Sequence, residues 1–151
     1  SERHAGFSRA ERTVRPVIDN GEYGYKKVNV ADQRREPHSL LNWCERRIRM
    51  RKECPELGWG DFTVLRTHAP DVLVLRYDFR GVSMLTLHNF SSRPKTVVVD
   101  PKVKGGNMLT DVFDDNHSRT ENGSHQLKLP PYGHRWLRVG AIDNVLHRTA
   151  F

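Results

Sequence analysis

The sequence is poor in cysteine and has no long apolar run. Its two cysteines, Cys44 and Cys54, are too few for a disulfide framework. One lies within an expected helix and the other at its end, and a helical rise of about 1.5 Å per residue separates them too far to bridge. No apolar run approaches the ~20 residues of a membrane span, and no signal peptide opens the chain. We therefore expect reduced thiols, no membrane partner and a cytoplasmic location.

Recognisable catalytic and metal-binding patterns are also missing. The 8 histidines are scattered, without the spacing of a zinc site, and no glycine-rich segment has phosphate-loop spacing. Asp111, Asp114 and Asp115 cluster in a way that could suit calcium, but a solvated turn is the favoured interpretation. The sequence therefore predicts no catalytic residue, metal or cofactor within this chain.

Basic residues outnumber acidic ones, and the excess is local. The first 54 residues carry 13 Lys and Arg against 8 Asp and Glu, whereas the remainder carries 12 against 10. A basic stripe between Arg34 and Lys52 could bind nucleic acid, with affinity that falls steeply with salt. Since such stripes are more often solvated faces or anchors to a neighbouring domain, we expect no nucleic-acid partner.

Prolines and glycines interrupt the periodic patterns of the sequence and divide the chain into two parts and a tail. Residues 1–36 have no sustained periodicity, and a helix is expected over about 37–53, with Ser39 helping to cap it and Pro55 and Gly58 beyond its end. A β-rich domain is expected over 56–140, and 141–151 are expected to form a flexible tail. An irregular stretch as long as 1–36 is uncommon in a self-sufficient domain. With no methionine at position 1, we expect the numbering to begin inside a longer product.

The expected helix has an apolar arc that two arginines interrupt. The arc consists of Leu40, Leu41, Cys44 and Ile48, with Trp43 and Met50 at its edge. Arg47 and Arg51 project into it one turn apart, and a guanidinium is costly to bury unless it is paired. Either these side chains meet carboxylates or carbonyl groups of a neighbour, or their stems lie along the edge with the charges in water. Cys44, on the apolar arc, is expected to be a buried and inert thiol.

Short apolar or alternating segments joined by polar turns predict an antiparallel β-sandwich. The expected strands are 62–65, 72–79, 82–87, 96–99, 108–113, 126–129 and 135–139. Arg80 and Gly81 give the turn of a hairpin between the second and third of these.

Two segments carry a resemblance to a known family. Residues 25–43 are YKKVNVADQRREPHSLLNW, and residues 49–60 are RMRKECPELGWG. They resemble the last barrel segment of the α-amylase superfamily (glycoside hydrolase family thirteen), and its trehalose synthase branch in particular. Residues 5–8 are similar to the loop after the family's last catalytic Asp, and residues 131–136 to the closing strand of its C-terminal domain. Glu36 stands where the family commonly has Asp.

The resemblance implies a mainly β fold: an antiparallel β-sandwich of the α-amylase C-terminal type, preceded by a loop and the last helix of a TIM barrel. Residues 1–55 would be the barrel tail and 56–140 the sandwich. The family's catalytic carboxylates lie upstream of Ser1, so none maps onto this chain. A parent enzyme would act on maltose or α-glucan by a retaining mechanism, isomerising maltose to trehalose in the trehalose synthase branch, and calcium is possible in that parent.

The chain's own role is therefore expected to be structural, with the upstream TIM barrel as its partner. The expected interdomain contacts are Trp43, Arg47, Arg51 and Trp59. A freestanding carbohydrate-binding module for maltose or α-glucan is the alternative, and it requires exposed aromatic side chains. The candidates are Trp59, Phe62, Tyr77, Phe79, Tyr132 and Trp136. Aromatic residues in strands are more often core, and Trp59, which lies between two glycines, is the best exception.

Overall fold

A computed structural model describes residues 2–140. The chain divides into two compact units, one ending at Arg49 and one beginning at Met50. We describe each unit by itself. The flexible tail expected at 141–151 lies outside the described residues.

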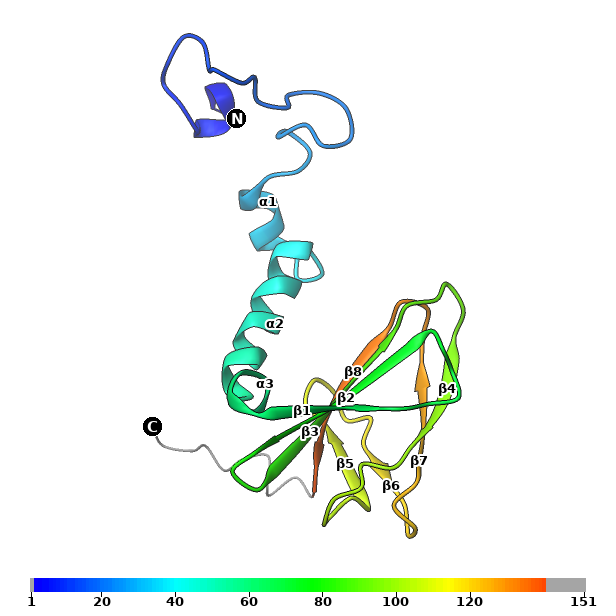
Figure 1. The fold of residues 1–151 in the computed structure, drawn as a ribbon. Coiled ribbons are helices and arrows are strands. Elements are labelled where there is room, and N and C mark those ends of the chain that lie inside the picture. Colours follow the sequence, from blue (N-terminus) through cyan, green and yellow to red (C-terminus); the bar gives the residue numbers. More distant parts are fainter. Residues whose placement is uncertain (1, 141–151) are drawn as a thin grey trace. The chain divides into compact units, whose positions relative to one another are not determined.

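The first unit contains little regular structure before its helices. A 3-10 helix, η1 (Arg3–Gly6), is followed by a long coil and then by the short α-helix α1 (Val30–Arg35) (Figure 1). The expectation that 1–36 are irregular is wrong for α1. Asn29 caps this helix, because its side-chain oxygen accepts a hydrogen bond from the main-chain N–H of Asp32 at 2.9 Å.

The main helix, α2 (Leu40–Glu53), begins three residues later than the sequence predicted and ends where it was expected to end. Residues 37–39 form a turn in which the main-chain N–H of Ser39 donates to the carbonyl of Glu36. The Ser39 hydroxyl accepts a hydrogen bond from Asn42 N at 3.2 Å, as expected of a helix cap. The last four residues of α2 belong to the second unit.

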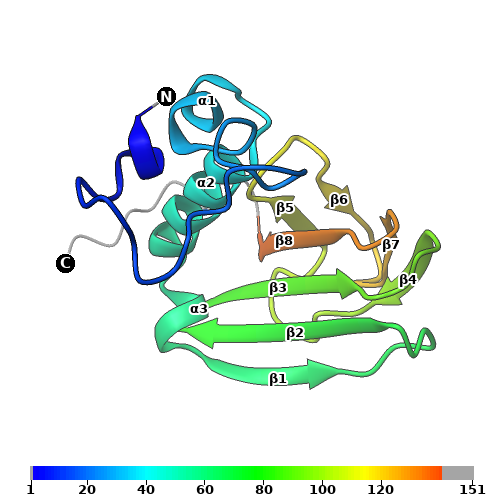
Figure 2. The same cartoon turned by 90° about the horizontal axis from the view of Figure 1, so that it is seen from above.

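Two antiparallel sheets dominate the second unit. The larger has the order β1-β2-β3-β8-β5-β6, and the smaller pairs β4 with β7. Figure 2 shows β1, β2, β3 and β8 side by side, with the one-turn helix α3 (Glu56–Trp59) near the start of β1. The strands are β1 (Asp61–Leu65), β2 (Val72–Phe79), β3 (Val82–Asn89), β4 (Lys95–Val99), β5 (Met108–Asp111), β6 (Ser118–Arg119), β7 (His125–Leu129) and β8 (His134–Val139).

The hydrophobic core lies between the two sheets. Alternate residues of both sheets point into it, as the period of two in β4 and β7 requires. Its fully or almost fully buried members include Val74, Leu85, Leu87, Val97, Leu109, Leu127, Leu129 and Leu137. Burying these side chains stabilises the unit by roughly 1.5–3 kcal/mol each relative to an exposed chain.

The predicted fold class is confirmed, since the described chain is mostly antiparallel sheet with few helices. All seven expected strands are present with small changes of boundary. The sequence missed β6 and α3, because two and four residues are too short for a periodic signal. Among the described residues, none of the helices has the length and apolarity to cross a bilayer.

Candidate functional site

A buried ion pair joins α3 to the large sheet. The carboxylate of Glu56, in α3, accepts a hydrogen bond from Arg138 Nε, in β8, at 2.8 Å. The exposed fractions of the two side chains are only 3% and 10%. Arg138 Nη2 also donates to the main-chain carbonyl of Glu53, the last residue of α2, at 3.0 Å. One arginine therefore fixes both the end of α2 and the start of α3 to the sheet, and charges buried in this way must remain paired.

Cys54 lies between these two helices and is buried in the same junction. Burial raises the pKa of its thiol from 9.0 to about 11, and the nearby carboxylates of Glu56 and Glu53 add to the rise against the opposing effect of Arg138. At neutral pH the thiol therefore stays protonated, which suits a packing role and not a nucleophile. The expectation of a buried thiol was placed on Cys44, which is only half-buried.

Close packing at the junction requires glycine at position 60. A Cβ atom on Gly60 would lie 2.5 Å from the carbonyl oxygen of Glu56 and 2.9 Å from that of Asp78, so no larger residue fits. Gly58 lies against the guanidinium of Arg51, which donates to the carbonyl of Leu57 at 2.8 Å. Arg51 thus meets a carbonyl of its own unit, whereas the sequence predicted a partner on a neighbouring domain. Trp59, between the glycines, has an exposed fraction of 77%.

In the first unit, polar side chains tie α1 to the start of α2. The Asn42 amide donates to the carbonyls of Gln33 at 2.9 Å and Glu36 at 2.7 Å. The Gln33 side chain accepts from Leu41 N at 3.0 Å, and the Ser39 hydroxyl donates to the carbonyl of Gln33 at 2.6 Å. These bonds satisfy main-chain groups that a helix end leaves unpaired. They give a structural role to Gln33 and Asn42, which sequence reasoning used only for recognition.

The predicted contact residues of α2 lie close together. The Arg47 guanidinium is 5.2 Å from the ring centroid of Trp43, a distance typical of a cation–π contact. Trp43 itself has an exposed fraction of 42%. The structure therefore brings Trp43 and Arg47 together on α2, and it places Arg51 against Gly58, next to Trp59.

A second buried ion pair lies near the other side of the large sheet. Asp111, in β5, accepts a hydrogen bond from Arg135 Nε, in β8, at 3.1 Å, and both side chains are buried. The interpretation of the aspartate cluster as a solvated turn is therefore wrong for Asp111, whereas Asp114 and Asp115 are exposed. Within residues 2–140, no three His, Cys, Asp or Glu side chains are arranged to hold a metal ion.

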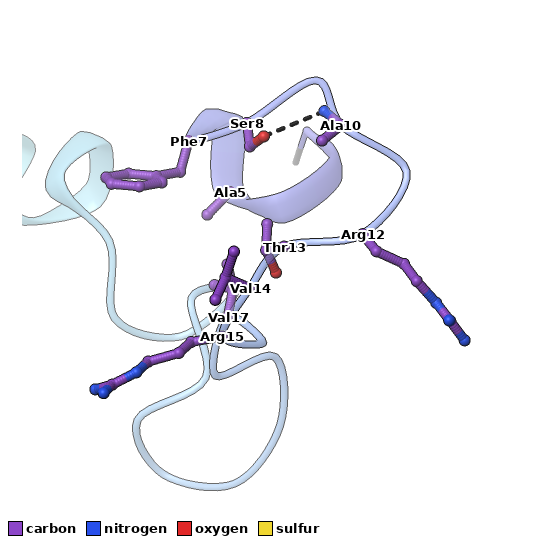
Figure 3. Close-up of a pocket in the computed structure, with 9 residues that line it drawn as sticks. All are labelled: Ala5, Phe7, Ser8, Ala10, Arg12, Thr13, Val14, Arg15 and Val17. Carbon is purple, nitrogen blue, oxygen red and sulfur yellow. Dashed lines mark hydrogen bonds between the residues drawn. The ribbon is translucent and has the colours of Figure 1, made fainter.

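The N-terminal coil of the first unit forms a hollow. It has a volume of about 830 Å³ and is lined by Ala5, Phe7, Ser8, Ala10, Arg12, Thr13, Val14, Arg15 and Val17. In Figure 3, Arg12 and Arg15 extend away from the hollow, and the Ser8 hydroxyl is engaged with the main chain of Ala10. Phe7 and Val14 are almost completely exposed. The hollow is thus an open, mostly apolar surface whose lining includes no carboxylate, histidine or cysteine.

The aromatic residues named as candidates for sugar binding were mostly expected to be buried in the core, and the structure shows several of them exposed. Phe62 and Tyr132 have exposed fractions of 64% and 70%, as high as a binding platform would need. Tyr77, Phe79 and Trp136 are half-buried. The expectation of core packing is therefore wrong for Phe62 and Tyr132, whereas Trp59 was expected to be the exception and is exposed.

Sequence reasoning missed Glu56, Arg138, Gln33 and Asn42, which make the densest polar contacts. From the sequence alone, a charged residue in a strand cannot be assigned either to the solvent or to a buried ion pair. Arg138 stands between apolar neighbours in β8, and this was the one available signal.

The fold defined by these sheets is that of the C-terminal β domain of α-amylases. An AmyP variant in complex with maltotriose matches with a TM-score of 0.62 and 18% identity, over 75% of this chain and 22% of that one. Isomaltulose synthase of Erwinia rhapontici NX5 matches with a TM-score of 0.59 and 22% identity, over 78% of this chain and 21% of that one.

The sequence comparisons are more specific. Residues 81–138 match the family model described as "Sucrose hydrolase-like, C-terminal domain". The chain is 28% identical to trehalose synthase of Thermus thermophilus over 97% of its length, and 34% identical to that of Pimelobacter sp. over 94%. It spans only 16% and 26% of these two relatives.

The resemblance to the α-amylase superfamily, and within it to the C-terminal region of trehalose synthase-like enzymes, is confirmed.

Proposed function

We propose that this chain is the non-catalytic C-terminal part of an enzyme that acts on maltose or a related α-glucan. The observation that carries the proposal is the buried junction between Glu56 and Arg138, which fastens the end of a helix to a closed sandwich core. A sandwich attached so firmly to the preceding helix is suited to bracing whatever that helix packs against. The small share of each trehalose synthase that the chain spans supports the same role.

The parent activity that we propose is isomerisation of maltose to trehalose. The names of the two trehalose synthases that match almost the whole chain support this choice. A retaining reaction needs a nucleophile and an acid/base carboxylate about 5 Å apart. These groups would come from a barrel upstream of Ser1, in a cytoplasmic enzyme.

Four residues are proposed as contacts to that upstream barrel: Trp43, Arg47, Arg51 and Trp59. Trp43 and Trp59 expose large aromatic surfaces, and such surfaces are enriched in interdomain contacts. Arg51 already binds a carbonyl of its own unit, so its role would be to hold the Trp59 segment in place.

The test is to incubate maltose with the product of the complete coding sequence and, separately, with the 151-residue chain, and to follow trehalose by NMR. We expect conversion by the complete product and none by the chain. Hydrolysis to glucose alone would replace the isomerase assignment by a glucosidase one. No reaction by the complete product would contradict the proposal.

A freestanding carbohydrate-binding module is the second candidate, and the exposure of Trp59, Phe62 and Tyr132 favours it. It requires the isolated chain to bind maltose or maltoheptaose, with release of heat and a shift in tryptophan emission. The structural role predicts neither signal at millimolar sugar.

A further inference from the structure

The chain contains two Asn-Gly pairs, and their sequence surroundings are alike. Asn20–Gly21 follows Asp19, and Asn122–Gly123 follows Glu121, so each pair has a carboxylate before it. Both asparagines are exposed, and both glycines have a left-handed backbone, with φ values of 73° and 77°. The sequence alone therefore gives little reason for one pair to react differently from the other.

An Asn-Gly pair can react with itself. The main-chain nitrogen of the glycine attacks the side-chain carbonyl carbon of the asparagine and loses its proton as the new C–N bond forms. Ammonia leaves, and water then opens the resulting succinimide at either carbonyl group, which gives aspartate or isoaspartate. Glycine favours the attack because it has no Cβ to hinder the approach and because its backbone is the most adaptable.

The structure restrains the second pair. The side-chain Oδ1 of Asn122 accepts hydrogen bonds from the hydroxyl of Thr120 at 2.8 Å and from the main-chain N–H of Ser124 at 3.0 Å. With its oxygen held as the acceptor of a turn, the side chain must leave this position before its carbon meets the nitrogen of Gly123. Asp100 Oδ1 also lies 3.8 Å from where a Cβ of Gly123 would stand. Its negative charge opposes loss of the proton from the Gly123 nitrogen.

The first pair has none of these restraints. Within residues 2–140, the carboxamide of Asn20 makes no hydrogen bond, and neither does the main-chain nitrogen of Gly21. Apart from the chain neighbours of Gly21, no heavy atom lies within 4 Å of the position that its Cβ would take. The Asn20 side chain can therefore rotate onto the Gly21 nitrogen without breaking a contact.

We propose that Asn20 is a site of spontaneous deamidation, whereas Asn122 is protected by its hydrogen bonds. The reaction consumes one water molecule and releases ammonia, so it needs no other reactant. It gives the first unit an additional negative charge. This proposal is independent of the proposed function, because it concerns chemistry between neighbouring residues of this chain.

The isoaspartate product would also disturb the loop around position 20. Isoaspartate lengthens the main chain by a methylene group, because the chain then runs through the side-chain carbon. The loop is closed by a hydrogen bond from Tyr25 N to the carbonyl of Ile18 at 2.9 Å. A Cβ on Gly24 would lie only 2.9 Å from Asn20 N, so the loop has little room for a longer chain. Deamidation should therefore open this loop as the protein ages.

Both pairs can be followed in one sample of the 151-residue chain. The chain is kept at mildly alkaline pH and digested at intervals, and mass spectrometry measures the mass increase from carboxamide to carboxylate in the peptides that contain Asn20 and Asn122. In the folded chain, Asn20 should react faster than Asn122 by about tenfold or more, because only Asn122 must give up hydrogen bonds. In urea, where those bonds are lost, the two rates should become similar.

Thr120→Val is the matched variant, because valine keeps the size of the side chain and removes a donor to Asn122 Oδ1. It should accelerate deamidation at Asn122 severalfold and leave the rate at Asn20 unchanged. Equal rates at the two asparagines in the folded chain would overturn the proposal, as would an Asn20 that reacts only in urea. A rate difference that persists in urea, or no effect of Thr120→Val, would contradict protection by the hydrogen bonds.

Discussion

Arg138 and Glu56 form one of the two buried ion pairs described in the second unit. Their charges are buried together, and each would be costly to bury alone. Arg138 also holds the final carbonyl of α2, so its loss would release a helix end as well as a carboxylate.

Arg138→Met should therefore lower the free energy of unfolding by about 3–5 kcal/mol, measured by urea denaturation, because Glu56 would be left buried without its partner. Arg49→Met is the matched control, since Arg49 pairs with Glu45 at 2.8 Å on an exposed helix surface. That control should stay within about 0.5 kcal/mol of the wild type. Similar losses in the free energy of unfolding for both variants would show that the buried ion pair contributes no more stability than the exposed one.

The two thiols should differ in reactivity. With the pKa of Cys54 raised to about 11 by burial, its thiolate is scarce at pH 8. Iodoacetamide should modify half-buried Cys44 first, as located by mass spectrometry, and the rate at Cys54 should keep rising as the pH approaches 11. Faster modification of Cys54 at pH 8 would mean that the junction opens readily.

At the scale of elements, the corner between α1 and α2 depends on one amide. Asn42→Ala removes hydrogen bonds to the carbonyls of Gln33 and Glu36, so amide hydrogen exchange over residues 30–42 should become faster by about tenfold or more. Exposed Asn116, which offers its main-chain carbonyl to Arg135, supplies the control Asn116→Ala. Unchanged exchange in Asn42→Ala would show that the corner is held by other contacts.

The elements also show what a sequence can and cannot predict. The strands β2 and β3 were predicted well because their apolar runs are long and a turn separates them. Helix α1 was missed since its six residues carry no apolar stripe and depend on the Asn29 cap. Asp111 was misassigned because its partner Arg135 is 24 residues away, and only the fold brings the two together.

At the scale of the whole molecule, one unit closes its own core and the other does not. The buried hydrophobic residues of the described chain lie at Cys54 and beyond, and α1 and α2 contain no buried residue. The first unit exposes Phe7, Val14, Ile18 and Tyr23 instead. Apolar surfaces of this kind mark contact with another domain. Under the proposed function, the sandwich would stabilise a larger enzyme and the first unit would pack against it.

The most direct test of this account is the half-life at elevated temperature of the maltose-converting activity of the complete product, compared with a version that ends at Gly60 and so lacks the strands. We predict that the shortened enzyme still forms trehalose but loses its activity severalfold faster, because the sandwich and the junction at Glu56 and Arg138 no longer brace it. Equal half-lives would contradict a structural role for the sandwich. Loss of catalysis at low temperature in a folded, shortened enzyme would contradict the claim that this chain is non-catalytic.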